Sequence, residues 1–371
     1  MPGDALHRLR DELPDDPEVI WRAPGRANLI GEHTDYNAGL VLPVALELAT
    51  FVGGRRAARV RLRSLDAGGQ ADVDPVTGEG PARGWGAYVT GVVKALKDEG
   101  VAVGGFDGIV SSDVPLGAGL SSSAALELAV ARAVAAEPVE PEALAEICRR
   151  AENVYVGMRC GIMDQMASSA AREGHALLID CRDDAIEHVP VPGGLVFLLM
   201  DSGVSRELAG SAYNERRAEA ERAAEALGVA SLRDATLEMV ESSHLGYPLR
   251  RRARHVVTEN ERVAATVRAL RRGATEELPA LFEASHRSLA EDYEVSTPEL
   301  DELVHIASEV EGIVASRATG AGFGGCTVNV VEADAAEEAA RKLAGRYASA
   351  RGIEPRWWIS GAAGGAGRVD A

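Results

Sequence analysis

The residues Val114-Pro-Leu-Gly-Ala-Gly-Leu-Ser-Ser-Ser-Ala-Ala, at positions 114–125, carry the strongest local signal for the fold. A strand-like segment at 108–112 runs into them, and an apolar segment with helical periodicity follows at 124–136. Gly117 and Gly119 allow backbone N–H groups to approach a ligand, and the start of a helix adds unsatisfied donors and a partial positive charge. The stretch therefore predicts an anion-binding loop that opens a helix; an ordinary loop with a serine N-cap is the alternative.

Strand-like and helical segments alternate on both sides of this loop. The other predicted strands lie at 41–48, 50–54, 60–64, 176–179, 195–200, 327–331 and 356–359, and the other predicted helices at 88–99, 141–155, 211–227, 251–272, 297–309 and 335–350. This mixture predicts an α+β protein, and 371 residues are comfortable for two domains. We place the domain boundary near residue 175, which gives 1–175 and 176–371. The tail at 361–367 contains only glycine and alanine and is expected to be loose.

The composition is that of a soluble globular protein, with 46% hydrophobic and 26% charged residues and no apolar run long enough to span a bilayer. Residues 1–14 lack the apolar core of a secretory signal. Cys148, Cys160, Cys181 and Cys326 have no metal-ligand spacing and are expected to be reduced thiols in a cytoplasmic protein. A formal net charge of −18 argues against nucleic acid or an anionic membrane as a partner. The sequence does not indicate an oligomeric state.

Lysine is nearly absent, and none of the three lysines follows a glycine. A Walker A loop, GxxxxGK[ST], is therefore excluded, and the HRD and DFG signatures of protein kinases are missing as well. Any phosphate chemistry in this chain must use backbone amides and arginine.

A second short stretch, residues 23–37, concentrates charged and polar side chains. It reads Ala-Pro-Gly-Arg-Ala-Asn-Leu-Ile-Gly-Glu-His-Thr-Asp-Tyr-Asn. Carboxylates and a histidine that converge can bind the hydroxyls of a sugar, and an arginine can neutralise charge on a transferring phosphoryl group. On composition alone, a solvated loop with a turn at 35–37 is the alternative.

Seven stretches of the chain are similar, in order, to a known family. GRANLIGEHTDY (25–36) resembles the galactokinase signature, VPLGAGLSSSAALE (114–127) the phosphate-binding second motif of the GHMP small-molecule kinases, and ATGAGFGGCTV (318–328) their third motif. AENVYVGMRCGIMDQ (151–165), HALLIDCR (175–182), RRARHVVTEN (251–260) and SHRSLAEDYEVS (285–296) are also similar to stretches of galactokinases. The resemblance implies the two-domain α+β GHMP kinase fold, with an active site in the inter-domain cleft. It also implies transfer of the γ-phosphate of ATP to the anomeric hydroxyl of galactose.

The resemblance also implies roles for individual residues. Asp164 matches the catalytic aspartate that would accept the proton of the anomeric hydroxyl, and Arg26 matches the arginine that would stabilise charge beside it. Ser123 and Glu152 match the ligands of Mg²⁺, an ion that prefers oxygen donors. The sugar-binding positions match Glu32, His33, Asp35, Gly161 (through its backbone) and Tyr213. The ATP-binding positions match Gly117, Gly119, Leu120, Ser121, Ser122 and Ser123, with Trp85 and Tyr88 near adenine.

The spacing of Glu152 and Asp164 tests whether these two carboxylates can share a site. On one straight helix, twelve positions span about 18 Å, which is too far for both to serve one phosphate. Gly157 and Gly161 lie between them, so we expect the helix to end and the chain to turn back. Without the resemblance, a surface carboxylate beside two arginines is the simpler interpretation of Glu152.

The chain departs from the family pattern at two positions. Ala321 stands where the third motif usually has glycine, which is costly if the position needs a positive φ and harmless otherwise. Ala212, just before Tyr213, replaces a glutamate that is common there and puts the local sugar loop in question.

Two alternative functions stay open at this point. One is the same chemistry on another acceptor, such as N-acetylgalactosamine, arabinose or a non-sugar alcohol. The other is a sugar and ATP sensor without turnover. The residues after the serine run and Asp164 are present, which favours an enzyme over the sensor.

Overall fold

The computed structural model describes residues 4–13, 17–158, 160–204 and 209–369. Its strands are β1 Val19–Asn28, β2 Leu40–Val41, β3 Pro43–Ala57, β4 Val60–Ser64, β5 Gln70–Val73, β6 Gly105–Ser112, β7 His175–Asp180, β8 Ala185–Pro190, β9 Leu195–Asp201, β10 Ile313–Ala318, β11 Cys326–Glu332, β12 Trp357–Ser360 and β13 Gly367–Val369. Its α-helices are α1 Asp4–Glu12, α2 Trp85–Asp98, α3 Ser122–Val134, α4 Pro141–Arg150, α5 Met163–Ala170, α6 Ala209–Leu227, α7 Leu237–Ser242, α8 Leu249–Arg272, α9 Leu278–Glu291, α10 Pro298–Ala307 and α11 Ala336–Arg351. Short turns of 3₁₀-helix lie at Asp35–Asn37, Leu232–Asp234 and Thr275–Glu277, and a π-helical turn lies at Ala151–Val156.

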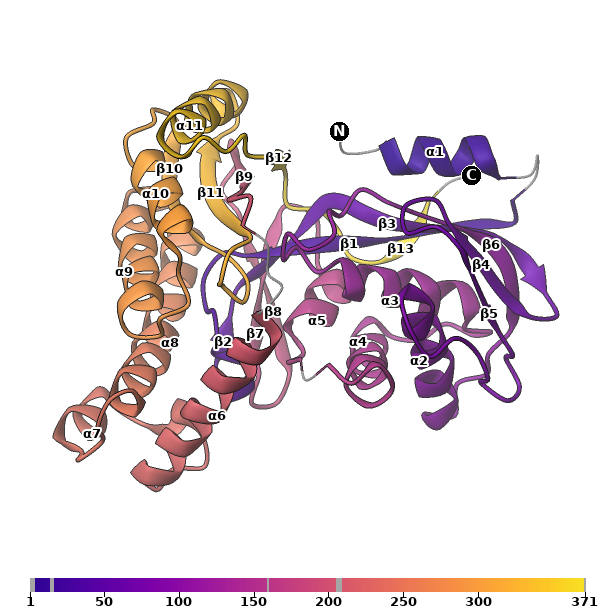
Figure 1. The fold of residues 1–371 in the computed structure, drawn as a ribbon, viewed down its shortest axis with the longest axis horizontal. Coiled ribbons are helices and arrows are strands. Elements are labelled where there is room, and N and C mark those ends of the chain that lie inside the picture. The colour runs from indigo at the N-terminus through magenta and orange to yellow at the C-terminus, as the bar shows by residue number, and fades with distance from the viewer. Residues whose placement is uncertain (1–3, 14–16, 159, 205–208, 370–371) are drawn as a thin grey trace.

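A six-stranded sheet, in the order β13-β1-β3-β6-β4-β5, organises the N-terminal part of the molecule. The helix α1 covers one face of this sheet, and α2 to α5 lie on the other (Figure 1). Successive side chains of a strand point to opposite faces. Phe51 accordingly packs with Leu9 under α1, whereas Val52 joins Leu96 and Leu128 in the core beneath α2 and α3.

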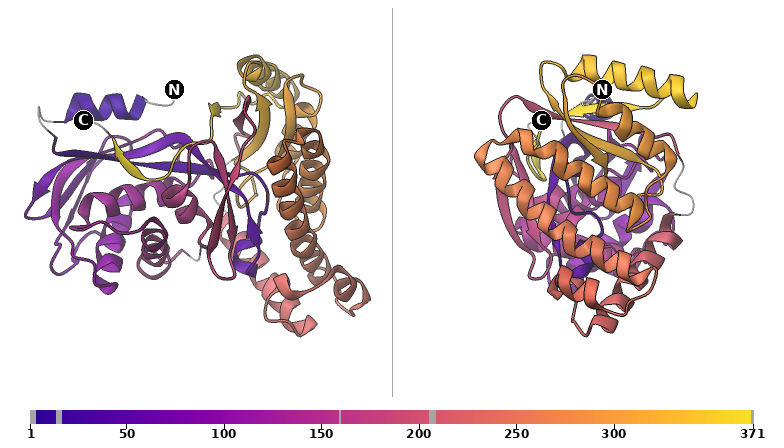
Figure 2. Two further views of the ribbon diagram at one scale, coloured as in Figure 1. Left: turned by 180° about the vertical axis from the view of Figure 1, so that it is seen from behind. Right: turned by 90° about the vertical axis from the view of Figure 1, so that its left-hand side faces the viewer.

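The C-terminal part is built on a four-stranded sheet, in the order β10-β11-β9-β12. Helices α10 and α11 pack on it through Leu303, Leu343 and Tyr347, and the long helices α8 and α9 stand beside it (Figures 1 and 2). A third sheet, β2-β7-β8, lies between the two parts. One continuous core cluster, which includes Leu42, Leu120 and Phe282, joins them.

A bulge in β1 brings an arginine to the loop that opens α3. The register of β1 against β3 shifts between Pro24 and Arg26. A Cβ on Gly25 would lie 2.7 Å from the carbonyl oxygen of Leu120, so only glycine permits this close approach. The backbone N–H of Arg26 donates to that same carbonyl at 3.1 Å. The sugar-signature strand and the glycine-rich loop are therefore held directly against each other.

The predicted α+β composition is confirmed, and most predicted elements occur near their predicted positions. The predicted strand at 60–64 is β4, and the predicted strand at 50–54 lies within β3. The predicted strand at 41–48 includes Val41 at the end of β2 and the first part of β3 from Pro43. The predicted helix at 141–155 is α4 followed by the π-helical turn, which ends at Gly157 with φ of 89°. The expected end of the helix between Glu152 and Asp164 is thus confirmed.

The prediction of a loose tail is wrong. The backbone N–H of Ala363 donates to Ala45, that of Gly365 to Ala171 and that of Ala366 to Ser168, and β13 pairs with β1. A Cβ on Gly365 would lie 2.3 Å from a backbone oxygen, so glycine here reflects close backbone packing rather than flexibility.

The domain boundary near residue 175 stays a prediction. Strands on either side of it share sheets, because β7 pairs with β2 and β13 pairs with β1. Within the described residues, no helix combines the length and the apolar character needed to cross a bilayer.

Candidate functional site

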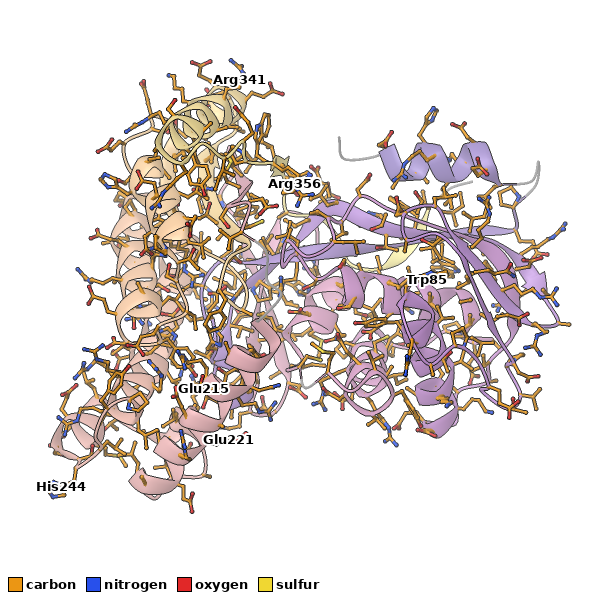
Figure 3. The ribbon with its side chains drawn as sticks, in the orientation of Figure 1. Trp85, Glu215, Glu221, His244, Arg341 and Arg356 are labelled. Atoms are coloured by element: carbon orange, nitrogen blue, oxygen red, sulfur yellow. The ribbon has the colours of Figure 1, made fainter. Side chains whose placement is uncertain are left out.

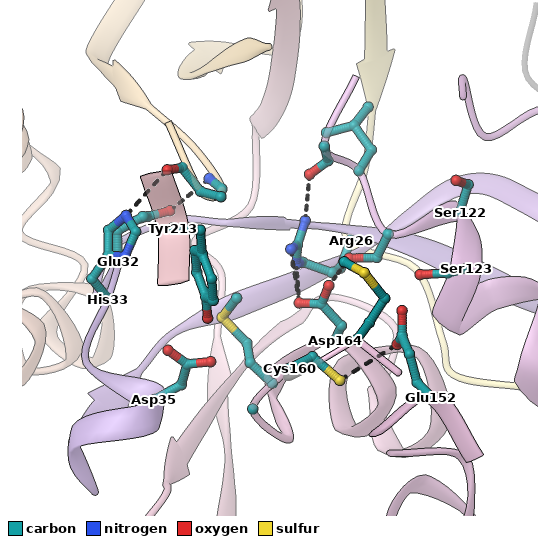
Figure 4. A pocket seen from close by; sticks show the side chains of 18 of the residues that line it. Arg26, Glu32, His33, Asp35, Ser122, Ser123, Glu152, Cys160, Asp164 and Tyr213 are labelled. Atoms are coloured by element: carbon teal, nitrogen blue, oxygen red, sulfur yellow. Dashed lines mark hydrogen bonds and ion pairs between the residues drawn. The ribbon is translucent and has the colours of Figure 1, made fainter. Parts of the chain in front are cut away.

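A cavity of about 550 Å³ lies where the two parts of the molecule meet. It brings together all of the predicted site residues except Trp85 and Tyr88. The predicted residues that line it are Arg26, Glu32, His33, Asp35, Gly117, Gly119, Leu120, Ser121, Ser122, Ser123, Glu152, Gly161, Asp164 and Tyr213. Residues distant in sequence thus share one pocket (Figure 4).

The carboxylate of Asp164, in the first turn of α5, is fixed by two side chains. Arg26 contacts Oδ1 through Nε at 2.9 Å and through Nη2 at 2.7 Å. The hydroxyl of Ser121 donates to Oδ2 at 2.6 Å. The buried Arg26 is held in turn by the carbonyl of Gly119, which accepts from Nη1 at 2.6 Å. Asp164 is therefore an oriented carboxylate with 27% of its side chain open to the pocket.

The glycine-rich loop turns sharply into α3. Gly117 and Gly119 have φ of 77° and 80°, and Ser121 has φ of 60°, a left-handed conformation that is uncommon for serine. Ser121 precedes α3, but its hydroxyl bonds to Asp164 and does not cap the helix. The alternative of a simple serine N-cap is therefore wrong. Ser121 leaves the first N–H groups of α3 without a side-chain cap, and these groups lie beside the pocket.

Glu152 lines the cavity from the π-helical turn. Its Oε2 accepts hydrogen bonds from Gln165 Nε2 at 2.7 Å and from Cys160 Sγ at 3.5 Å. Burial raises the pKa of Glu152, and the negative charge of Asp164 adds to this, while hydrogen bonds from Cys160, Ser123 and Gln165 oppose it. A carboxylate that is short of positive partners, beside the hydroxyl of Ser123, has the hard oxygen donors that suit Mg²⁺.

Behind Glu152 lies a second carboxyl group that the sequence did not single out. Glu127 of α3 is fully buried, and Gln165 Nε2 donates to it at 3.2 Å as well as to Glu152. Burial first, and the charge of Glu152 second, raise the pKa of Glu127 well above its usual value. A single amide therefore links two carboxyl groups along one wall of the site.

His33 is held in place by its own loop and by the third motif. Its Nε2–H donates to the carbonyl of Ala321 at 3.2 Å, so Nδ1 accepts from the hydroxyl of Tyr36 at 2.8 Å. Burial lowers the pKa of His33 to about 3, so the ring is neutral. The ring also packs against Tyr213 and Tyr293. Both nitrogens have protein partners, which fixes the orientation of the ring.

Asp35 and Glu32 present two further carboxyl groups to the same side of the cavity. Burial is the main cause that raises the pKa of Asp35 to about 6, and the charge of Asp164 adds to it. Glu32 is only 2% exposed, and its Oε1 accepts from the N–H of Gly320 at 3.0 Å. Buried oxygen acceptors beside the aromatic ring of Tyr213 form a surface suited to a small molecule with several hydroxyls.

Trp85 and Tyr88, in the first turn of α2, lie outside the lining of the cavity. The indole Nε1 of Trp85 donates to the carbonyl of Gly68 at 2.9 Å, on the N-terminal part of the molecule (Figure 3). Burial, followed by the charges of Glu152 and Glu127, raises the pKa of Tyr88 to about 12. Their role near adenine stays a prediction.

The two departures from the family pattern have different environments. The left-handed positions of the third motif are Gly320, Gly322, Phe323, Gly324 and Gly325. Ala321 is not among them, so alanine carries no backbone penalty there. It lines the cavity, and its carbonyl accepts from His33. Ala212 is half-buried in α6 and, unlike Tyr213, does not line the cavity.

Sequence reasoning missed several lining residues. These are Gly157, Met158, Cys160, Met163, Asn214, Gly320 and Ala321, besides Gln165 and Glu127 behind the wall. Most of them belong to the family-like stretches quoted above, so membership of those stretches could have identified them. Nothing in the sequence pointed to Asn214.

Comparisons with known proteins find similarity over nearly the whole chain. A family model described as the galactokinase galactose-binding signature matches residues 10–56, and models of the GHMP kinase N-terminal and C-terminal domains match residues 87–172 and 266–349. A galactokinase from Roseiflexus sp. (strain RS-1) is 44% identical, covering 99% of this chain and 97% of its own. The human galactokinase is 43% identical, covering 98% and 95%.

Solved structures give the same grouping. The crystal structure of Lactococcus lactis galactokinase complexed with galactose superposes with a TM-score of 0.88, at 32% identity over 95% of both chains. The mevalonate kinase of Methanococcus jannaschii superposes with a TM-score of 0.69 at 17% identity, over 94% of this chain and 100% of the other, which shows a shared fold.

Proposed function

The chain belongs to the galactokinases of the GHMP kinase family, and from this premise we propose how its pocket moves the γ-phosphate of ATP to the anomeric hydroxyl of galactose. The observation that carries the proposal is the carboxylate of Asp164, oriented by Arg26 and Ser121 between the sugar-signature loop and the glycine-rich loop. The products are galactose 1-phosphate and ADP.

Asp164 is the base of this reaction. Its open face accepts the proton from the anomeric hydroxyl, the most acidic hydroxyl of the sugar, while that oxygen attacks the γ-phosphorus. Arg26 stabilises the carboxylate and the charge that develops on the transferring group. Direct in-line transfer then needs positioning and charge neutralisation, without a covalent enzyme intermediate.

The ATP phosphates bind at the start of α3. Backbone N–H groups of the loop from Gly117 to Ser123 donate to the phosphate oxygens, since the chain has no Walker A lysine. Ser123 and Glu152 would hold Mg²⁺, and the bound ion would supply charge neutralisation for the phosphates of ATP. Trp85 and Tyr88 lie beside the adenine.

Galactose binds on the other side of Asp164. The carboxylates of Glu32 and Asp35 accept hydrogen bonds from its hydroxyls, Tyr213 packs against it, and the backbone of Gly161 contributes a polar group. The neutral ring of His33 completes this wall. We also propose a cytoplasmic location, which the thiols of Cys148, Cys160 and Cys181 support.

Release of ADP with Mg·ATP, measured across galactose, glucose, N-acetylgalactosamine, arabinose and no sugar, tests the proposal. We expect turnover with galactose, and phosphorus NMR of the product should give a 1-phosphate. Turnover with only a different sugar would support the proposed phosphoryl transfer and change the assignment of the substrate. Tight binding of galactose and ATP without turnover would refute the enzyme and support the sensor.

A further inference from the structure

A buried charge cluster lies directly behind the sugar-side wall of the pocket. Its centre is Arg317 of β10, whose side chain has no exposed surface. Glu32 of the sugar-signature loop and Glu259 of α8 are the two carboxylates beside it. Because a buried unpaired charge is costly, every charged group in such a cluster depends on the others for its position.

Arg317 contacts two other segments of the chain through three separate nitrogen atoms. Its Nη2 forms an ion pair with Oε2 of Glu32. Its Nε donates to the hydroxyl of Ser285 in α9 at 3.1 Å, and its Nη1 donates to the carbonyl of Leu29 at 3.0 Å. A planar guanidinium with these fixed partners can hold a carboxylate in one orientation.

Glu259 shares the guanidinium and also holds the backbone beside Glu32. Its Oε1 lies 3.7 Å from Arg317 Nη2 and accepts from the N–H of Gly31 at 3.0 Å and from the hydroxyl of Ser285 at 2.6 Å. Although burial opposes its ionisation, the neighbouring Arg262, His255 and Arg317 lower the pKa of Glu259 to about 2. Glu259 is therefore ionised at neutral pH, and it holds both Arg317 and the backbone N–H of Gly31 beside Glu32.

Glu32 is thus held at both carboxylate oxygens and at its backbone carbonyl. Arg317 fixes Oε2, the N–H of Gly320 fixes Oε1, and His255 Nε2 donates to its backbone carbonyl at 3.1 Å. Glu32 nevertheless lines the cavity, with 2% of the residue exposed.

We propose that Arg317, supported by Glu259 and Ser285, is a positioning residue that orients the carboxylate of Glu32 for the sugar hydroxyls. This inference rests on the proposed function, because it concerns the sugar-binding side of that site. Arg317 lies behind Glu32 and does not line the cavity, so it acts only through Glu32. Its loss should weaken sugar binding and leave nucleotide binding intact.

Arg317→Lys is the main test, with Arg252→Lys as its matched control. Lysine keeps the charge but cannot reproduce the bonds to Glu32, Ser285 and Leu29. Arg252 of α8 is also buried and also bridges two glutamates, Glu219 at 2.7 Å and Glu294 at 2.6 Å, but it does not line the pocket. The measurements are the KM values for galactose and ATP, and the rise in Tm that galactose produces without ATP.

We expect Arg317→Lys to raise the KM for galactose at least about tenfold, with the KM for ATP unchanged and the galactose-induced rise in Tm diminished. Arg252→Lys should lower Tm without changing either KM. Equal rises in both KM values, or an unchanged KM for galactose, would overturn the inference and leave Arg317 with a purely structural role.

Ser285→Ala keeps the test decisive if the lysine variant does not fold. It removes only the hydroxyl that joins Arg317 to Glu259, and we expect a rise of about threefold in the KM for galactose alone. No rise would overturn the inference. If the wild-type protein neither turns over galactose nor gains stability from it, the proposed function fails. Defects confined to the variants would not refute the proposed function, so the two failures can be told apart.

Discussion

The carboxylate of Asp35 lies against the backbone of Gly161, so closely that a Cβ on Gly161 would stand 2.1 Å from Oδ2 of Asp35. The conformation of Gly161 is not left-handed, so crowding alone demands glycine there. The end of the Asp35 side chain can rotate away from a methyl group, but it would then leave its position in the pocket.

Gly161→Ala should therefore raise the KM for galactose about tenfold while changing Tm little, because the carboxylate moves and the backbone does not. Steady-state kinetics with each substrate varied in turn measure this. Gly193→Ala, at a position where a Cβ has open space, is the control and should behave as wild type. A large loss of stability in Gly161→Ala with an unchanged KM would contradict the role of Asp35.

The raised pKa of Asp35 predicts a pH dependence of sugar binding. With a pKa of about 6, Asp35 is a carboxylate at pH 8 and gains a proton as the pH falls through 6. An ionised acceptor binds hydroxyls more strongly than a protonated one, so the KM for galactose should rise below pH 6. Kinetics from pH 5 to 8 should show this in the wild type and not in Asp35→Asn, whose KM should be high throughout. A flat wild-type profile would refute the assignment.

Glu152→Gln tests the proposed Mg²⁺ site. The amide keeps the shape of the side chain but loses the charge that attracts the ion, so the Mg²⁺ concentration for half-maximal turnover should rise about tenfold. Chelation of Mg²⁺ should abolish turnover in the wild type. Glu146→Gln, which changes an exposed carboxylate on α4, is the control. If both variants need the same Mg²⁺ concentration as wild type, Glu152 is not a ligand.

Glu127→Gln should stabilise the protein increasingly as the pH rises. The pKa of Glu127 in the folded protein is raised well above 4.5, its usual value, so the folded chain keeps a proton that the unfolded chain releases above pH 4.5. The free energy of unfolding therefore falls with rising pH, by up to about 1.4 kcal/mol per pH unit from this group.

The glutamine variant removes that loss, because it does not titrate. Urea unfolding at pH 5, 7 and 8 should show that the difference in free energy of unfolding between variant and wild type grows with pH. A constant contribution of the amide to this free energy does not affect the trend. Glu225→Gln, on the exposed side of α6, should give no such trend. A difference that is constant with pH would show that Glu127 is ionised in the folded protein.

The sequence predicted the helices and strands around the site better than it predicted the contacts between their side chains. The glycines and serines of residues 114–125 predicted the loop and the helix after it, because these signals are local. The strand β1 was not predicted, since Pro24, Gly25 and the polar residues after them are typical of a loop. At the bulge in this strand the N–H of Arg26 donates to the carbonyl of Leu120, a long-range contact that the local sequence does not contain.

Spacing alone allowed Glu152 and Asp164 to share a pocket but did not require it. The resemblance to the family predicted that Arg26 and Asp164 lie side by side, which no local sequence pattern could have predicted. The partnership of Arg317 with Glu32 depends on tertiary contacts between β10 and the end of β1, as does the ordering of the tail by Ser168 and Ala171. Close backbone packing and buried ion pairs are set by the whole fold, which a one-dimensional pattern does not contain.

The most direct test of the central claim compares the wild type with Asp164→Asn, by the rate of ADP release with Mg·ATP and galactose and by galactose binding. Asparagine keeps an oxygen for Arg26 or Ser121 but cannot take up the proton. We predict that galactose still binds within a few-fold of wild type and that kcat falls by about 10²–10⁴-fold. Turnover by Asp164→Asn within tenfold of wild type would contradict the assignment of Asp164 as the base.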